Sequence, residues 1–107
     1  YKSEYIDGWV RAMIGSTLRH NLVKGNCFLA LGNFLLGKSC HSFDSDTKVR
    51  IDRKGMKRFY YADVQVVCES NQQTSVFQDT PVMIIEVLSP STRCYDLDEK
   101  MTAYLGI

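Results

Sequence analysis

The sequence has 107 residues with 13 basic and 12 acidic side chains, a net charge of +1, and 45% hydrophobic residues. This length and composition predict one globular domain with a modest core and exclude a disordered chain. The near-zero net charge excludes a protein held on nucleic acid or an anionic membrane by bulk charge alone. No apolar run approaches the roughly 18 residues of a membrane span, and the first residues lack the apolar stretch of a signal peptide, so we expect neither.

The first third of the chain predicts a β-hairpin and then a long helix. Asp7-Gly8 is a two-residue turn signal within residues 4–14. Residues 15–17 offer an N-cap, and apolar residues then recur at steps of three and four over 17–36. We expect this stripe to face the core, where its two glycines would allow close approach to a sheet. The stripe consists of Leu18, Leu22, Gly25, Leu29, Gly32 and Leu36, and it is widened by Val23, Cys27, Ala30 and Phe34.

The rest of the chain predicts three strands and a final helix. The expected strands are rich in β-branched, aromatic or other apolar residues, and polar segments separate them. This order of elements favours an α/β protein in which helices cover the faces of a sheet. The expected elements are strands at 47–51, 57–68 and 81–88, a turn at 52–55, a loop at 69–80 and a helix at 92–105.

The cysteines are widely spaced and form no CxxC pair. We therefore expect reduced thiols, as in a cytoplasmic protein. A structural zinc site built from Cys40, His41 and His20 would lack the paired-ligand spacing of such sites. The four cysteines are Cys27, Cys40, Cys68 and Cys94.

Two acidic residues interrupt apolar strand segments. Glu86 lies within VMIIEVL, where an unpaired buried carboxylate is costly, and Asp63 lies within FYYADVQVV, where Asp is disfavoured. Each alone has an ordinary structural explanation, a salt bridge to a core Arg or Lys or a solvated strand end. On neighbouring antiparallel strands, the two carboxylates with a backbone carbonyl would form an oxygen site suited to Mg²⁺.

Two further groups extend this candidate site. On the final helix, Asp96, Lys100 and Tyr104 share one face, so Lys100 either pairs with Asp96 at the surface or reaches Glu86. Segment 48–58 carries six basic side chains against one acid, which suits either a solvated hairpin tip or a contact with phosphates. The candidates for nucleic-acid binding are Lys48, Arg50, Arg53 and Lys54.

Several motifs, in their order along the chain, resemble the Uma-two family of restriction endonuclease-like proteins in the PD-(D/E)XK nuclease-like superfamily. The resemblance spans residues 4–104 and implies one partial PD-(D/E)XK nuclease-like domain over residues 1–107. The implied fold is a restriction-endonuclease-like mixed β-sheet flanked by helices, incomplete at its C-terminus. The motifs are Glu4-Tyr-Ile-Asp7-Gly8, Arg19-His20-Asn21, Ser45-Asp46-Thr-Lys48-Val49-Arg50, Ala62-Asp63-Val64 and Ile85-Glu86-Val87-Leu88-Ser89-Pro90-Ser91-Thr92, followed by Asp96, Lys100 and Tyr104.

The resemblance also implies roles for single residues. Asp63 corresponds to the aspartate of the PD motif and Glu86 to the acid of the (D/E)XK motif, so the two would bind Mg²⁺ or Mn²⁺ with the Val87 carbonyl. Lys100 would be catalytic. Accessory roles would fall to Glu4 and His20, although the local sequence around His20 predicts only a surface histidine.

Two positions depart from the family pattern. Ala62 stands where proline is usual, and Leu88 stands where the motif has lysine. Lys100 on the following helix suits the role of that lysine. We therefore expect a metal-dependent endonuclease that hydrolyses DNA phosphodiester bonds, a cytoplasmic homodimer with no membrane contact. The alternatives are a catalytically impaired nucleic-acid-binding or interaction module of the same fold, or an inert truncated domain that oligomerises to cover its sheet edges.

Overall fold

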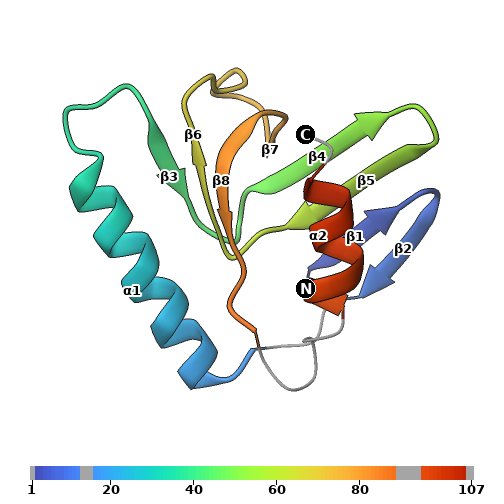
Figure 1. Cartoon of the computed structure of the whole chain (residues 1–107), viewed down its shortest axis with the longest axis horizontal. Coiled ribbons are helices and arrows are strands. Elements are labelled where there is room, and N and C mark those ends of the chain that lie inside the picture. The colour runs from blue at the N-terminus through green and yellow to red at the C-terminus, as the bar shows by residue number, and fades with distance from the viewer. Residues whose placement is uncertain (1, 13–15, 89–94, 106–107) are drawn as a thin grey trace.

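The computed structural model describes residues 2–12, 16–88 and 95–105, which form two β-sheets and three helical segments (Figure 1). The elements are β1 (Ser3–Ile6), β2 (Trp9–Ala12), α1 (Leu18–Phe34), β3 (His41–Phe43), β4 (Lys48–Arg53), β5 (Met56–Tyr61), β6 (Val64–Val67), β7 (Phe77–Gln78), β8 (Pro81–Ile85), η1 (Tyr95–Lys100) and α2 (Met101–Tyr104). The larger sheet has the strand order β2-β1-β5-β4-β7 and the smaller sheet the order β3-β6-β8. In Figure 1, α1 lies beside the smaller sheet and α2 beside the larger one.

The N-terminal hairpin forms as the sequence predicts. β1 and β2 pair antiparallel, and Asp7 and Gly8 between them have φ angles of 48° and 98°. These left-handed conformations belong to the two-residue turns that match the twist of the flanking strands. The Asp7 carboxylate also accepts hydrogen bonds from the Arg58 guanidinium and, with a smaller effect, from the Lys57 amide; both lower its pKa and hold the hairpin against β5.

Helix α1 begins where the sequence predicts but turns a different side to the sheet, and of the predicted stripe only Cys27 and Gly32 are half-buried. The Thr17 hydroxyl caps it by accepting a hydrogen bond from the His20 amide at 3.2 Å. The predicted core-facing stripe is wrong, because Leu18 is 88% exposed, Leu29 is 62% exposed, and Gly25 has no neighbour within 4 Å of an added Cβ. The smaller sheet has three strands and covers one narrow stripe of the helix. The half-buried positions are His20, Lys24, Cys27, Phe28, Leu31 and Gly32.

The predicted strand at 57–68 is in fact two strands in different sheets. β5 ends at Tyr61, β6 begins at Val64, and Ala62 and Asp63 link the two. The structure also contains β3 and β7, two short strands that the sequence does not predict. Because β7 pairs parallel with β4, the larger sheet is mixed. The link therefore places Asp63 at the junction of the two sheets.

The strand predicted over 81–88 forms, but it is shorter than predicted and it is not buried as the apolar sequence suggests. β8 ends at Ile85 and lies at the end of its sheet order, so that Val82 and Met83 are 65% and 48% exposed. Edge strands of this kind keep one side open to solvent. Glu86 follows the strand directly and stands at its end rather than within it.

The predicted helix at 92–105 is a π-helical turn, η1, continued by the short helix α2. π-Helical turns occur frequently at functional sites, and Lys100 is the last residue of this one. Residues 92–94, including Cys94, and the side chain of Asp96 lie outside the described part of the structure, so the proposed Asp96–Lys100 pair stays a prediction. In the described residues, no helix has both the length and the apolar character needed to cross a membrane.

The main core lies between the larger sheet and α2. Val49, Ile51 and Tyr60 are at most 2% exposed, and Ala103 of α2 packs among them. Burying a large apolar side chain stabilises a fold by roughly 1.5–3 kcal/mol. The Tyr104 ring also meets the Tyr60 ring edge-on, with 5.7 Å between centroids. This packing holds the C-terminal helix in place and sets the direction of its polar side chains.

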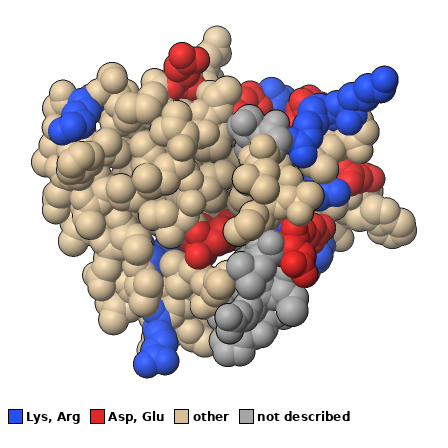
Figure 2. All heavy atoms as spheres, viewed as in Figure 1, with Lys and Arg blue, Asp and Glu red and all other residues tan. Residues whose placement is uncertain are grey.

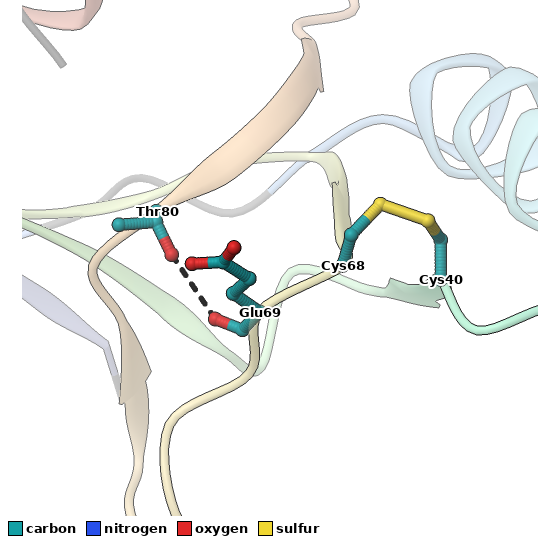
Figure 3. Close-up of a disulfide and its surroundings, with 4 residues drawn as sticks. All are labelled: Cys40, Cys68, Glu69 and Thr80. Atoms are coloured by element: carbon teal, nitrogen blue, oxygen red, sulfur yellow. Dashed lines mark hydrogen bonds between the residues drawn. A yellow bond between two sulfur atoms is a disulfide. The ribbon is translucent and has the colours of Figure 1, made fainter.

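The prediction of reduced thiols is wrong for two cysteines, because Cys40 and Cys68 form a disulfide (Figure 3). They immediately adjoin the antiparallel β3–β6 pair, which brings their Cα atoms within 4.0 Å. A bonded Cys40 is not available as a zinc-binding thiolate. Next to the disulfide, the Thr80 hydroxyl donates to the Glu69 carbonyl at 3.0 Å (Figure 3). The end of β6 that is farther from Asp63 is therefore linked to β3 by the disulfide and to the start of β8 by this hydrogen bond.

Candidate active site

Asp63 and Glu86 lie at the adjoining ends of two paired strands. Val64 and Ile85 are the last pair in the β6–β8 register, and Asp63 and Glu86 are the residues immediately beyond it. The Val87 amide donates a hydrogen bond of 2.7 Å to Asp63 Oδ2. The two acidic side chains are 13% and 14% exposed. Antiparallel pairing thus brings two acids from distant parts of the chain to one corner of the sheet.

Lys100 reaches this corner from the C-terminal helical segment. Its Nζ lies 3.1 Å from Glu86 Oε1 and 3.6 Å from Glu4 Oε2, and it donates to the Tyr61 carbonyl at 3.0 Å. The Lys100 side chain is 3% exposed, and a charge so deeply buried persists only when it is paired. The structure therefore shows Lys100 in contact with Glu86, one of the two partners that the sequence predicts for it.

Tyr104 and Glu4 add further contacts around Lys100. The Tyr104 hydroxyl donates to Glu86 Oε1 at 3.0 Å, and Glu4 Oε2 accepts a 2.9 Å hydrogen bond from the Tyr61 amide. The i, i+4 spacing of Lys100 and Tyr104 is the sequence signal for the contact of Tyr104 with Glu86, although the sequence alone assigns it none. Tyr61 contributes backbone atoms, which no side-chain pattern reveals.

His20 lies against Asp63 instead of at the surface. Its Nε2 is 3.3 Å from Asp63 Oδ2, and its side chain is 12% exposed. His20 Nδ1 is buried and has no hydrogen-bond partner among the described residues. The prediction of a surface histidine from the local sequence is thus wrong, because the N-terminal turn of α1 approaches the junction of the two sheets.

The donor set at this corner fits a hard divalent cation. Among the described residues, no three His, Cys, Asp or Glu side chains gather closely enough to hold a metal together. A cation held by Asp63 and Glu86 would need further ligands, such as the Val87 carbonyl and water. Carboxylate, carbonyl and water oxygens are the ligands that Mg²⁺ and Mn²⁺ prefer.

Most of the basic hairpin lies away from the acids. Lys48 pairs in register with Tyr61, beside the site, whereas Arg53 and Lys54 belong to the other end of the β4–β5 hairpin. The six residues of β5 separate the two ends by about 20 Å of strand. Figure 2 shows Lys and Arg side chains protruding at the upper right, over this hairpin. The sequence led us to expect the tip beside the carboxylates, and the structure shows that it is not adjacent to them.

Two arginines of the hairpin already have acidic partners. Arg50 donates to both oxygens of Asp79, at 2.6 and 2.9 Å, and Arg58 donates to Asp7 at 2.9 Å. These hydrogen bonds raise the pKa of both arginines and lower the pKa of Asp79. The charge that the hairpin offers to a ligand is correspondingly smaller than the sequence count.

Sequence comparison finds related proteins over the whole chain. The model of the Uma2 family, described as "Putative restriction endonuclease", matches residues 1–107. The uncharacterized protein slr1290 of Synechocystis sp. is 34% identical over 104 residues, covering 96% of this chain and 54% of that protein. The uncharacterized protein sll1609 of the same organism is 29% identical over 109 residues, covering 99% and 60%. The chain spans somewhat more than half the length of these relatives.

Structure comparison finds a similar fold in the crystal structure of a "putative nuclease belonging to DUF820" from Anabaena variabilis. The TM-score is 0.72 at 17% sequence identity, with 94% of this chain and 57% of that chain covered. At this level of identity the likeness shows a shared fold. The predicted α/β fold with helices flanking a mixed sheet is therefore confirmed, with the strands divided between two sheets.

Proposed function

Because the chain belongs to the Uma2 family, described as "Putative restriction endonuclease", we propose that it forms the catalytic part of an endonuclease that hydrolyses DNA phosphodiester bonds with Mg²⁺ or Mn²⁺. One observation carries the proposal. Asp63 and Glu86 stand at adjoining strand ends, and the buried amine of Lys100 contacts Glu86 at 3.1 Å. In this proposal Lys100 takes the role of the motif's lysine, because Leu88 occupies the usual position.

The cation would be held by Asp63, Glu86 and the Val87 carbonyl. When bound, such an ion polarises a phosphoryl oxygen and makes a coordinated water more acidic. The Val87 amide orients Asp63 through its 2.7 Å hydrogen bond. His20 approaches the same carboxylate oxygen at 3.3 Å and limits the rotation of that side chain.

Lys100 supplies positive charge where negative charge develops on the phosphate in the transition state. Charged groups that are held in place before reaction stabilise such a transition state most effectively. The Tyr61 carbonyl and Glu4 position the Lys100 amine, and the Tyr104 hydroxyl positions Glu86. Glu4 and Tyr104 are therefore positioning residues in this proposal.

DNA would reach the site along Lys48, with Arg53 and Lys54 contacting phosphates farther away. Arg50 is less suited to this role, because its guanidinium is held by Asp79. A homodimer and a cytoplasmic location stay predictions alongside this proposal, and sedimentation velocity of the purified chain tests the first of them.

The proposal is tested by incubating the chain with plasmid DNA in buffers that contain Mg²⁺, Mn²⁺ or EDTA. We expect cleavage only with a divalent cation. Asp63→Asn and Glu86→Gln should each reduce the cleavage rate at least roughly 100-fold, since even changes behind metal ligands cost 10–100-fold. Asp52→Asn and Glu69→Gln remove one charge each at exposed positions and serve as matched controls.

Either of two results would overturn the proposal. One is no metal-dependent cleavage by the chain, and the other is equal cleavage by the Glu86→Gln and Glu69→Gln variants. DNA binding without cleavage and without dependence on metal would favour the alternative, a binding module of the same fold.

A further inference from the structure

The larger sheet has a second face, opposite the core, that the proposed chemistry does not use. Side chains alternate between the two faces of a strand, so Tyr60 enters the core while Phe59 and Tyr61 point the other way. Tyr5 is paired with Phe59 and Lys48 with Tyr61. We call this surface the outer face; its residues are Tyr5, Lys48, Arg50, Phe59, Tyr61 and Phe77, all half-buried.

The outer face carries a row of aromatic rings beside a small hollow. The Phe59 ring lies between those of Tyr5 and Phe77, with centroids 6.0 and 5.6 Å away and both contacts edge-to-face. The hollow has a volume of about 200 Å³, below the roughly 300–1,000 Å³ of pockets for drug-sized ligands, and therefore has room only for a small group. Its lining residues are Ser3, Glu4, Tyr5, Val10, Lys48 and Phe59.

Lysine amines flank this row at the end nearest the acids. Lys2 Nζ and Lys48 Nζ lie 5.0 and 5.6 Å from the centroid of the Tyr61 ring. Lys2 also meets the exposed carboxylate of Asp46 at 2.8 Å, whereas Lys48 makes no ion pair with any described residue. Positive charge beside aromatic rings is the composition of surfaces that bind single-stranded nucleic acid.

We propose that the outer face binds an unpaired nucleotide of the DNA substrate, with its base in the hollow against Tyr5 and Phe59 and its phosphates at Lys48 and Lys2. This inference rests on the proposed function, which identifies the bound polymer as DNA. Bases in a duplex are stacked on each other, so only an unpaired base offers its face to a protein ring. Tyr61 connects this surface to the candidate active site, because its backbone carbonyl accepts from Lys100.

The experiment measures binding of a fluorescent oligothymidylate of about 12 nucleotides by anisotropy, with EDTA present. A second probe of equal length replaces the bases by abasic sites and keeps every phosphate. Phe59→Leu should weaken binding of oligothymidylate at least about fivefold, the effect of losing one stacked base, and leave the abasic probe unchanged. Lys48→Gln should weaken both probes and reduce the salt dependence by about 0.7 in log–log slope.

The chain itself offers a matched control pair. Lys38 lies 4.7 Å from the centroid of the Phe34 ring on a different part of the surface, so it repeats the contact of a cation with a ring. Phe34→Leu and Lys38→Gln should bind both probes like the parent chain. Thermal unfolding checks that each variant folds, and Tyr5→Leu replaces Phe59→Leu if the latter does not.

Equal binding of the two probes by the parent chain would overturn the inference. So would equal effects of Phe59→Leu and Phe34→Leu, or a preference for duplex over single-stranded DNA. The assay needs no cation and no cleavage. A chain that cuts DNA but fails here overturns this inference alone, and a chain that binds as expected but never cuts overturns the proposed function alone.

Discussion

Replacing Lys100 by methionine removes the charge at the centre of the candidate active site while keeping an unbranched side chain. The Lys100 amine contacts Glu86 at 3.1 Å and Glu4 at 3.6 Å, and it donates to the Tyr61 carbonyl. Glu4 is 2% exposed and Glu86 14% exposed. The substitution therefore leaves two carboxylates in a poorly hydrated place without this cation.

Removing one partner of a buried ion pair lowers the free energy of unfolding by about 3–5 kcal/mol. Domains have total unfolding free energies of roughly 5–15 kcal/mol, so Lys100→Met should remove a large share of the stability. At about 4 °C or more per kcal/mol for a domain of this size, the unfolding midpoint should fall by at least about 12 °C. The assay is thermal and urea unfolding followed by circular dichroism.

Two further variants make this prediction sharper. Lys38→Met makes the same change at an exposed lysine and should shift the free energy of unfolding by less than about 0.5 kcal/mol. Adding Glu86→Gln to Lys100→Met should recover about 1 kcal/mol or more, because it removes one of the two negative charges that lost the Lys100 contact. If Lys100→Met unfolds within about 1 kcal/mol of the parent chain, the buried ion pair does not stabilise the fold and the reasoning is refuted.

Two other predictions concern links between strands. Asp79→Asn removes the negative charge and one of the two oxygens that accept from Arg50, and it should lower the free energy of unfolding by about 1 kcal/mol at pH 7, a modest value because both side chains are about one-third exposed. These bonds lower the pKa of Asp79, so its contribution is complete above the unfolded pKa of about 3.9 and is lost as the pH falls through the folded pKa. The two unfolding curves should therefore converge in acid, and a constant difference would contradict this. The Cys40–Cys68 disulfide closes a loop with a sequence separation of 28, so replacing both cysteines by serine should lower the free energy of unfolding by about 3–4 kcal/mol. Dithiothreitol should destabilise the parent chain but not the double variant, and equal sensitivity would show that the disulfide contributes nothing.

Local signals explain the elements that the sequence predicts well. Asp7-Gly8 specifies its hairpin because both residues tolerate the left-handed conformation that the turn needs. Thr17 specifies the start of α1 because its hydroxyl satisfies a free backbone amide. The direction that α1 faces depends instead on which sheet it meets, and periodicity cannot identify the partner. The leucines at 18 and 29 are therefore exposed.

The division of residues 57–68 depends on tertiary pairing in the same way. Tyr61 and Val64 are both typical strand residues, and the change of sheet at Ala62 and Asp63 follows from pairing with β3 and β8. The short strands β3 and β7 have too few residues to show a pattern. For the candidate site, Asp63 and Glu86 are visible as acids among apolar residues, whereas the position of His20 follows from the family resemblance and not from its neighbours in sequence.

Because of the contacts around Lys100, the candidate site can form only after both ends of the described chain have folded. These contacts join Glu4 near one end of the described chain to Tyr104 near the other, a separation of 100 positions. Closing a loop of that length costs about 4 kcal/mol of chain entropy, and contacts so distant in sequence form slowly. The β4–β5 hairpin has local contacts and is expected to form early. The acids and Lys100 should come together only in the last stage, so partly folded chains would have the sheet without the site.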